Sequence, residues 1–465
     1  MAGVDDTVSL TTTNKGKPSL HVNGYLYRLD RTYAKSKTWR CAKNGCKARC
    51  RTDLEHSNVQ FTNKHCDHET QSDRGMTVKE FRRNCKRRGA DDLFQKPSKI
   101  MRQELQNMNA HLETGDIERV RKAMYHERRK QLPTLPNSRA ETHDRIDQHQ
   151  VTSCRGEQMI HVNDAAKGII ILTTRTNMQL LCDRNAQIFG DGTFKTCPRF
   201  FYQLYTLHAY KNGHYVPCVF ALLPSKAQDA YVDMFEHIKT MAENFGIAFQ
   251  PQDVTLDFEK ATHAAAKSIW HQIRIKGCHF HLSQAWYRKI ASLGLSDAYK
   301  TADSDIGVWL KRFFGLSFLS AHEIQDCFAF DLMDDAPADD RFGDYVLSTY
   351  VSDEATFPPH VWAHPDLNTI TTTNACESFH RHFSDLFYRA HPTVFELIDK
   401  LKEVQTISYV KINTMNNQAR QPPMRAARKL KLQQMEHLKT DYENGTITRK
   451  EYVNGMATRN LPAVL

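Results

Sequence analysis

The succession of short apolar runs and helical segments between residues 168 and 281 constrains the fold of this chain more than any other feature. Four β-rich runs come first, and Asn212-Gly213 between the last two is typical of a tight hairpin turn. A helix, two further β-rich runs and an Ala-rich helix between them follow. From residue 186 the order β-β-β-α-β-α-β predicts a mixed sheet with crossover helices. The predicted strands are 168–172, 186–193, 201–210, 215–223, 254–257 and 273–281, and the predicted helices are 229–244 and 260–270.

The rest of the chain divides by composition into regions that together predict an α+β protein. The first residues are polar and rich in Thr, Asn and Lys, which indicates a disordered tail. Three basic helices end at residues 132–136, where two prolines favour an extended linker. The predicted regions are 1–19 (disordered tail), 20–70 (small β-rich module), 71–150 (basic helices and linker), 151–400 (mixed-sheet domain with a helical insertion at about 285–365) and 401–465 (basic helical tail).

Charge is distributed unevenly along the 465 residues. The formal net charge of +10 combines +11 over residues 1–150, −8 over 151–399 and +7 over 400–465. Basic ends around an acidic core indicate a polyanionic partner, either nucleic acid or an anionic membrane surface, although basic ends can also serve solubility alone.

Several classes of protein are set aside by the same sequence. The N-terminus lacks the pattern of a signal peptide, and no apolar run approaches the ~20 residues of a membrane helix. We therefore expect a soluble intracellular protein that does not bind membranes, whose 12 cysteines are thiols or metal ligands rather than disulfides.

Cys41, Cys46, His65 and His68 have the composition of a Cys2His2 zinc site. Thiolate sulfur and imidazole nitrogen can close a tetrahedron around Zn2+, and a module of about 50 residues buries too little apolar surface to fold easily without a metal. Spacing alone leaves open the alternative of scattered surface cysteines and histidines.

The same segment contains Tyr25-Leu26-Tyr27, Trp39-x-Cys41 and Cys46-Lys47-Ala48-Arg49, through which it resembles the FLYWCH zinc finger. That family usually ends in His-x-His, whereas this chain has His65-Cys66-Asp67-His68. The third ligand is therefore either His65 or Cys66, with His65 favoured. The resemblance implies a structural Zn2+ and a module that binds nucleic acid or protein.

Three carboxylates stand where predicted elements begin or end. Asp191 and Asp257 each lie at the end of a predicted strand, and Glu377 lies at the start of a predicted helix near residue 374. Desolvating an acid is costly, and three acids gathered at one sheet edge would repel one another unless Mg2+ or Mn2+ bound there. Each also has an ordinary interpretation, as a turn residue, a helix cap and a first-turn helix acid respectively.

Several short motifs connect this central region with a known family. They are 191–194, 201–206, 216–217, 221–224, 257–259 and 374–377. Through them roughly residues 75–415 resemble the Mutator-like element (MULE) transposases. The resemblance implies an RNase H-like fold with a helical insertion, in which Asp191, Asp257 and Glu377 form a catalytic Asp-Asp-Glu site for two Mg2+ or Mn2+ ions. It also implies an accessory pair, Cys278 and His281, which either places flanking DNA or packs in the core.

The implied activity is that of a DNA transposase, in which cleavage at terminal inverted repeats is followed by attack of a freed 3′-hydroxyl on target DNA. The alternatives are a domesticated, catalytically silent zinc-finger DNA-binding protein and an RNase H-like nuclease without strand transfer. We expect double-stranded DNA as partner, a nuclear location and a homo-oligomer. Candidate phosphate contacts are Arg82, Arg83, Lys86, Arg87, Arg88, Arg128, Arg129 and Lys130, together with Arg425, Arg428, Lys429 and Lys431.

Overall fold

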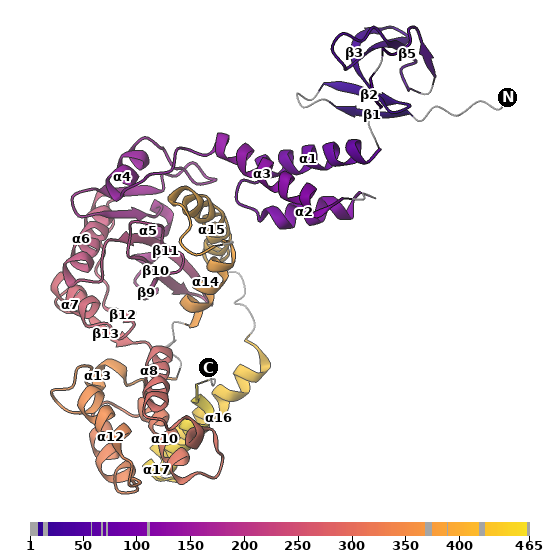
Figure 1. Cartoon of the computed structure of the whole chain (residues 1–465). Helices are drawn as coiled ribbons and strands as arrows, with labels where there is room; N and C mark the ends of the chain where they lie inside the picture. Colours follow the sequence, from indigo (N-terminus) through magenta and orange to yellow (C-terminus); the bar gives the residue numbers. More distant parts are fainter. Residues whose placement is uncertain are drawn as a thin grey trace. The chain divides into compact units, whose positions relative to one another are not determined.

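A computed structural model of the chain divides into two compact units, Met1–Thr134 and Leu135–Leu465, which are considered separately (Figure 1). The division falls within the predicted linker at 132–136. Every helix among the described residues is too short or too polar to cross a bilayer. The structure describes residues 8–12, 17–56, 58–66, 68–70, 73–108, 112–367, 374–387, 389–417 and 424–462.

The first unit begins with a six-stranded antiparallel sheet whose strands follow chain order. Its small core packs Leu20, Tyr27 and Trp39. The prediction of a disordered tail over 1–19 is wrong for residues 8–12, because this segment pairs with β2 as an edge strand, with Val8 opposite Val22. The strands are β1 (Val8–Thr12), β2 (Pro18–Val22), β3 (Tyr25–Tyr33), β4 (Ser36–Cys41), β5 (Arg49–Thr52) and β6 (Val59–Phe61).

Three helices complete the first unit, where the sequence predicts basic helices. Phe81 of the first and Val120 of the third are fully buried in a second small core. Pro97 begins the second helix, where its missing N–H costs nothing, and a capping box of Glu113 and Asp116 begins the third. The helices are α1 (Asp73–Asp91), α2 (Pro97–Gln106) and α3 (Thr114–Gln131).

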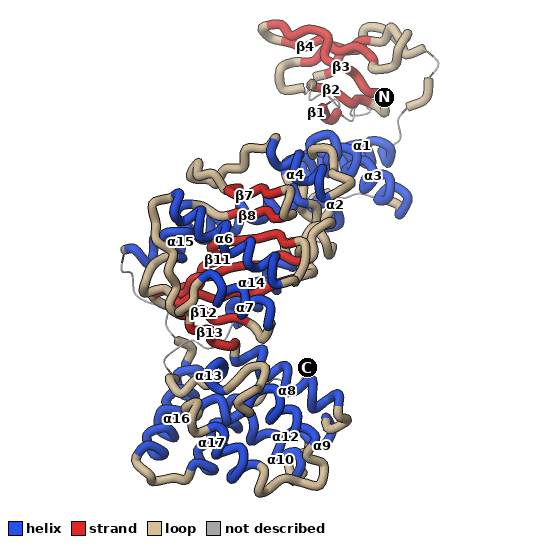
Figure 2. The backbone as a smooth tube through the Cα atoms, turned by 90° about the vertical axis from the view of Figure 1, so that its left-hand side faces the viewer, coloured by secondary structure: helices blue, strands red, loops and turns tan. Residues whose placement is uncertain are grey.

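A seven-stranded mixed sheet forms the centre of the second unit and confirms the predicted mixed sheet (Figure 2). β9, β10 and β11 are antiparallel, whereas β12 and β13 run parallel to β9. Asn212 and Gly213 have φ of 48° and 79° and form the predicted hairpin turn between β10 and β11. The order is β13-β12-β9-β10-β11-β8-β7, with β7 (Ile160–Asp164), β8 (Ile169–Leu172), β9 (Gln187–Thr193), β10 (Gln203–Lys211), β11 (His214–Leu223), β12 (Asp253–Leu256) and β13 (Arg274–Gly277).

The last predicted strand, 273–281, is wrong at its end. β13 stops at Gly277, and α8 (His279–Ser292) begins two residues later. Leu282, Trp286 and Ile290 recur every four residues and are all buried, which is the pattern of a helix that packs on one face. The prediction extended the strand too far because it did not use the helical spacing of the apolar residues after residue 281.

Helices cover both faces of the mixed sheet. α6 (Gln228–Asn244) and α7 (Lys260–Ile269) contribute Met234, Ile238 and Ala265 to the core on one face. α14 (Asn374–Asp385) and the first half of α15 (Val394–Asn416) contribute Phe383 and Leu397 to the core on the other. Two shorter helices, α4 (Arg139–Asp147) and α5 (Arg175–Leu181), complete these layers. The sheet is therefore enclosed, and its strand ends are the places where polar chemistry can reach solvent.

A second, wholly helical core lies in the sequence between α7 and α14, in agreement with the predicted helical insertion, and it is completed by the C-terminal helices. Trp286, Trp309 and Trp362 lie at its centre. The carbonyl oxygen of Val453 lies where a Cβ on Gly315 would stand, so the last helix packs directly on the inserted segment. The main helices are α9 (Ser296–Lys300), α10 (Asp305–Arg312), α12 (Arg341–Val346), α13 (Pro359–Trp362), α16 (Ala426–Glu443) and α17 (Arg449–Asn460).

Gly190 in β9 is predicted to tolerate no side chain. An added Cβ would lie 2.5 Å from the Tyr205 hydroxyl oxygen and 2.7 Å from Cδ2 of Leu256, both in the packed core. We expect Gly190→Ala to lower the free energy of unfolding by about 1–3 kcal/mol. In Gly115→Ala, a helical control, the nearest atom would be 3.7 Å away, so that variant should be neutral or slightly more stable. Calorimetric melting of both variants tests this, and an unchanged melting temperature for Gly190→Ala would contradict it.

Candidate functional site

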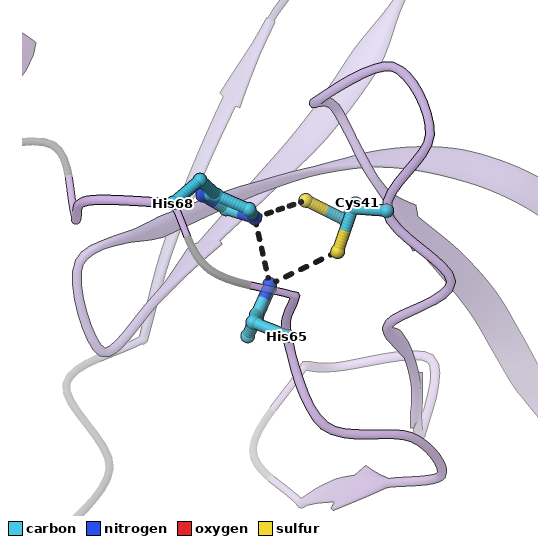
Figure 3. Close-up of side chains that lie close together, drawn as sticks. Cys41, His65 and His68 are labelled. Atoms are coloured by element: carbon cyan, nitrogen blue, oxygen red, sulfur yellow. Dashed lines mark hydrogen bonds between the residues drawn. The ribbon is translucent and has the colours of Figure 1, made fainter.

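The two cysteines and two histidines predicted to bind zinc lie together in the first unit. Cys41 ends β4, Cys46 lies in the turn before β5, and His65 and His68 come from the segment after β6 (Figure 3). Their ligand atoms all lie within 4.8 Å of one another, the only such group of three or more candidate ligands in the described part of the chain. This group contains His65 and not the exposed Cys66, which favours His65 as the third ligand.

The spacing of these atoms matches a tetrahedral zinc site. Cys41 Sγ is 3.5 Å from Nε2 of His68, and Cys46 Sγ is 3.5 Å from Nδ1 of His65. The two histidine nitrogens are 3.2 Å apart. With Zn–S of about 2.3 Å and Zn–N of about 2.05 Å, tetrahedral geometry requires roughly 3.6 Å between sulfur and nitrogen and roughly 3.3 Å between nitrogens. The donor set and its dimensions therefore fit Zn2+.

Two tyrosines hold His65 in the orientation that this site needs. Nε2 of His65 lies 2.6 Å from the Tyr27 hydroxyl oxygen, to which the Nε2–H can donate. That hydrogen bond leaves Nδ1 unprotonated and free to bind a metal. The Tyr25 ring stacks on His65 with centroids 3.6 Å apart and an angle of 10°. The Tyr-Leu-Tyr motif thus supports the ligand from outside the site.

The two thiols differ in acidity. Burial tends to raise the pKa of the Cys46 thiol, but hydrogen bonds from the backbone of Ala48 and Cys66 and from His68 outweigh it and lower that pKa to about 5. Burial, together with the neighbouring Cys46, raises the pKa of Cys41. One sulfur is therefore a thiolate at neutral pH, and a cation between the two favours ionisation of the other.

Asp191 lies in β9, and Asp257 directly follows β12, the parallel neighbour of β9 in the second unit. Thr255 of β12 pairs with Phe189 of β9, and continuing this register by two residues places Asp257 beside Asp191. Neighbouring strands are about 4.8 Å apart and alternate residues share a face, so both acids lie on the same face near the carboxyl edge of the sheet. The structure thus brings together two acids that are 66 positions apart in the sequence.

Asp257 has the environment of a cation ligand. Its Oδ1 is buried and accepts no hydrogen bond from the described residues. Burial raises the pKa of this carboxyl group, while His281 and Lys226 lower it and Glu259 raises it further. An unpartnered buried carboxylate oxygen is a donor that suits a hard divalent ion.

Asp191 contacts a histidine that the sequence did not single out. Its Oδ2 lies 3.4 Å from Nε2 of His380, and its Oδ1 accepts a 2.8 Å hydrogen bond from the backbone of Gly192. Burial, aided by His281, lowers the pKa of His380 to about 4, so His380 is neutral at pH 7 and leaves the aspartate charge available to a cation. The sequence did contain a signal for His380: it follows Glu377 by three residues on the same predicted helix, and residues at that spacing share one side of a helix.

The third predicted acid, Glu377, belongs to α14, one helical turn before His380. The contact between His380 and Asp191 holds this helix against β9. The side chain of Glu377 lies outside the described residues, so its position in the triad remains a prediction.

Cys278 and His281 lie at the start of α8 rather than in a strand. Cys278 is fully buried, and its backbone N–H donates to the carbonyl oxygen of Leu256 over 2.8 Å. His281 lies close enough to Asp257 and His380 to lower the pKa of both. The structure therefore places His281 near the acid pair, defined as Asp191 and Asp257, whereas Cys278 packs against the end of β12.

Some basic side chains predicted to contact DNA are engaged within the protein. Arg88 pairs with Glu104 at 2.7 Å, and Lys86 pairs with Glu127 at 2.9 Å. Arg128 is only 4% exposed and donates to three backbone carbonyl groups, those of residues 89, 92 and 95. The prediction that Arg128 contacts phosphate is therefore wrong, because its guanidinium is buried and hydrogen-bonded to the end of α1 and the loop that follows.

Other members of the predicted basic set remain at the surface. Arg83 and Lys130 are held in weaker ion pairs of 3.4 and 3.5 Å with acids on their own helices. Arg82, Arg87 and Arg129 are exposed and form no ion pair with any residue that the structure describes. Arg425, Arg428 and Lys429 at the start of α16 are exposed as well. Of the predicted set, Arg82, Arg87, Arg129, Arg425, Arg428 and Lys429 are therefore the exposed side chains that a polyanion could contact.

A Cys2His2 module, followed by a mixed sheet with two aspartates near one edge, defines an α+β protein with one candidate metal site among its described residues. Residues 10–67 match the family model of the FLYWCH zinc finger domain, and residues 188–285 match that of the MULE transposase domain. The chain therefore carries a FLYWCH zinc finger and a MULE transposase domain, as the resemblance predicted. None of the curated proteins matches the chain.

The substitution Asp257→Asn is expected to raise stability at neutral pH. The folded pKa of Asp257 lies above its unfolded value of about 3.9, so the ionised carboxylate destabilises the fold at pH 7. Removing the charge should raise the free energy of unfolding by roughly 1–2 kcal/mol, an advantage that shrinks as the pH falls through the raised pKa. Asp253→Asn on the same strand should act oppositely, because Asp253 pairs with Arg274 at 2.8 Å. Chemical denaturation between pH 4 and 8 measures both, and a destabilised Asp257→Asn would contradict the prediction.

Proposed function

We propose that this protein is a DNA transposase that cleaves DNA at the terminal inverted repeats of a Mutator-like element and joins the freed strand to target DNA. The observation that carries the proposal is the placement of Asp191 in β9 and of Asp257 directly after its parallel neighbour β12, both inside the segment that matches the MULE transposase domain. The unpartnered oxygen of Asp257 supports a cation between them.

The proposed architecture of this domain is RNase H-like. Three sequential antiparallel strands, β9 to β11, followed by β12 and β13 parallel to β9, support it. The helical insertion then separates β13 from α14, which carries Glu377 as the proposed third acid. A helix that returns over the sheet next to β9 is consistent with an acid delivered to the same edge.

The described side chains would prepare this edge for phosphodiester chemistry. Two Mg2+ or Mn2+ ions, when bound by the acids, would activate the attacking oxygen and stabilise the leaving oxygen. Asp191 is held by the Gly192 N–H and by neutral His380, which fix the carboxylate without cancelling its charge. The Tyr205 hydroxyl and Leu256 fill the space beside Gly190, which keeps β9 and β12 in close register. The chain contributes position and charge rather than a nucleophile.

Binding of double-stranded DNA is proposed for the FLYWCH module and for the exposed arginines of the basic helices. Arg82, Arg87 and Arg129 lack acidic partners among the described residues, so phosphate groups can take that place. A nuclear location and assembly into a homo-oligomer belong to the same proposal.

The test is cleavage in vitro by the full chain on DNA that carries the inverted repeats flanking its coding region. We expect strand breaks at the repeat ends with Mg2+ or Mn2+ and none when these ions are left out of the zinc-loaded protein, and joining of the freed 3′ ends to a target plasmid. Specific DNA binding with no cleavage at any divalent ion concentration would contradict the proposal and indicate a DNA-binding role alone.

A further inference from the structure

The connection between β9 and β10 presents three large aromatic side chains to solvent. Phe194, Phe200 and Tyr202 are 43%, 42% and 53% exposed. The middle of the same connection faces inward, since Thr196 and Cys197 are buried. Exposing three aromatic rings within nine residues costs hydrophobic free energy, and such patches commonly mark a binding surface.

This aromatic surface, defined as Phe194, Phe200 and Tyr202, is held in place. The rings of Phe194 and Tyr202 meet edge to face with centroids 5.5 Å apart. Phe200 has a φ of 76°, a left-handed conformation that is rare for an aromatic residue and is found mostly where function requires it. His391 anchors the inner side of the loop, with its N–H 2.9 Å from the Lys195 oxygen. The exposure is therefore built into the fold rather than a consequence of a loose loop.

A chain of short contacts connects the aromatic surface with the acid pair. The ammonium group of Lys226 lies 4.7 Å from the centre of the Phe194 ring and 3.3 Å from Oε2 of Glu259. The Glu259 N–H in turn donates to the Asp257 carbonyl oxygen over 2.9 Å. Phe194 also follows Asp191 by only three residues on β9 and the loop after it. The aromatic surface thus borders the proposed cleavage site.

The charges around the rings favour a phosphate-bearing ligand. Lys195 and Arg199 are exposed within the loop, and Lys226 lies over Phe194. Stacked aromatic rings with interspersed lysine and arginine are the features that bind single-stranded nucleic acid, because every base offers a π face and every nucleotide a phosphate. Bases within an intact duplex are already stacked and offer no such face.

We infer that Phe194 and Tyr202 stack on unpaired bases of a DNA strand next to the proposed cleavage site, with Lys195 and Arg199 contacting its phosphates. The inference rests on the proposed function for the identity of the strand, and it adds a binding site for separated bases to that function. Phe194 and Tyr202 are positioning residues in this account, since they hold the strand and take no part in bond breaking.

Binding by the zinc-loaded full chain is measured on a single-stranded oligonucleotide of about 20 thymidines and on a blunt duplex of equal length, both without added Mg2+ or Mn2+. We expect Phe194→Ala and Tyr202→Ala each to weaken single-strand binding about tenfold, with an unchanged dependence on salt, because stacking neutralises no phosphate. Tyr202→Phe should retain affinity, and duplex binding should not change. Phe330→Ala is the matched control, since Phe330 is 69% exposed but lies in the helical insertion.

A second measurement locates the strand. Irradiation of the full chain with an oligonucleotide of the same length containing 5-iodouracil should produce adducts on the tryptic peptides 185–195 and 200–211, which carry Phe194 and Tyr202. Adducts elsewhere only, or a double variant that binds the thymidine strand as tightly as the parent, would overturn the inference. Neither assay contains Mg2+ or Mn2+, so a protein that fails to cleave DNA could still give both results. The binding proposal and the cleavage proposal can therefore fail separately.

Discussion

Replacement of Asp191 by asparagine is expected to lower the rate of metal-dependent DNA cleavage by at least about a thousandfold. Metal-ion stabilisation of charge in a transition state is worth several kcal/mol, and each 1.4 kcal/mol is a factor of ten. Asparagine keeps the size of the side chain and can still accept the hydrogen bond from the Gly192 N–H. The loss would therefore report the missing charge rather than a changed shape.

The matched control for this substitution is Asp229→Asn. Asp229 is an exposed acid in the first turn of α6, in the same domain. Its substitution removes one negative charge without touching the carboxyl edge of β9 and β12, so cleavage should be unchanged. Rates are compared at equal DNA occupancy, with melting temperatures recorded for both variants. Retained cleavage by Asp191→Asn would remove this residue from the catalytic site.

Loss of zinc is expected to unfold the β-rich module while the mixed sheet stays folded. Structural zinc contributes about 10–16 kcal/mol of apparent binding free energy in small modules, far more than the core of Leu20, Tyr27 and Trp39 can replace. Chelation of the full chain should therefore raise amide hydrogen exchange over β2 to β5 and leave β9 to β11 protected. Hydrogen exchange followed by mass spectrometry measures both regions in one sample.

Two cysteine variants separate a zinc ligand from a bystander. Cys46→Ser removes a sulfur 3.5 Å from Nδ1 of His65, and it should abolish bound zinc. Cys66→Ser changes the exposed neighbour of His65, which lies outside the four-residue cluster, and should keep one zinc per chain. Metal analysis of the purified proteins provides the measurement. Equal zinc content in the two variants would contradict the assignment of His65 and Cys46 as ligands.

The sequence predicted most strands of the mixed sheet because their signals are local. Asn212-Gly213 specifies a turn by itself, and the spacing of apolar residues in α6 specifies a helix by itself. Errors arose where residues outside the segment determine its secondary structure. Residues 8–12 were predicted to be disordered, but they form a strand by pairing with β2, where Val8 lies opposite Val22. Residues 278–281 were predicted to end a strand, but the buried apolar residues that follow them at helical spacing place them at the start of α8.

The sequence predicted the type of each candidate site, but it did not predict all the residues that form it. Residue types and spacing identified the four zinc ligands, yet the choice of His65 over Cys66 needed distances between atoms. The basic cluster predicted cations for DNA, but Arg128 proved to be buried against three carbonyl groups. The sequence does not show whether an arginine side chain is exposed or buried, because the residues that surround it come from distant segments of the chain.

The sequence by itself determined the order of most elements, the Cys2His2 donor set and the family resemblances, since these depend on residue type and short-range spacing. Only the tertiary structure placed Asp257 beside Asp191, brought His380 and His281 to them, and turned Phe194 and Tyr202 outward next to that edge. These relations depend on strand register and on helices that pack across the sheet from as many as 189 residues away. Long-range packing sets those distances, and no local pattern encodes them.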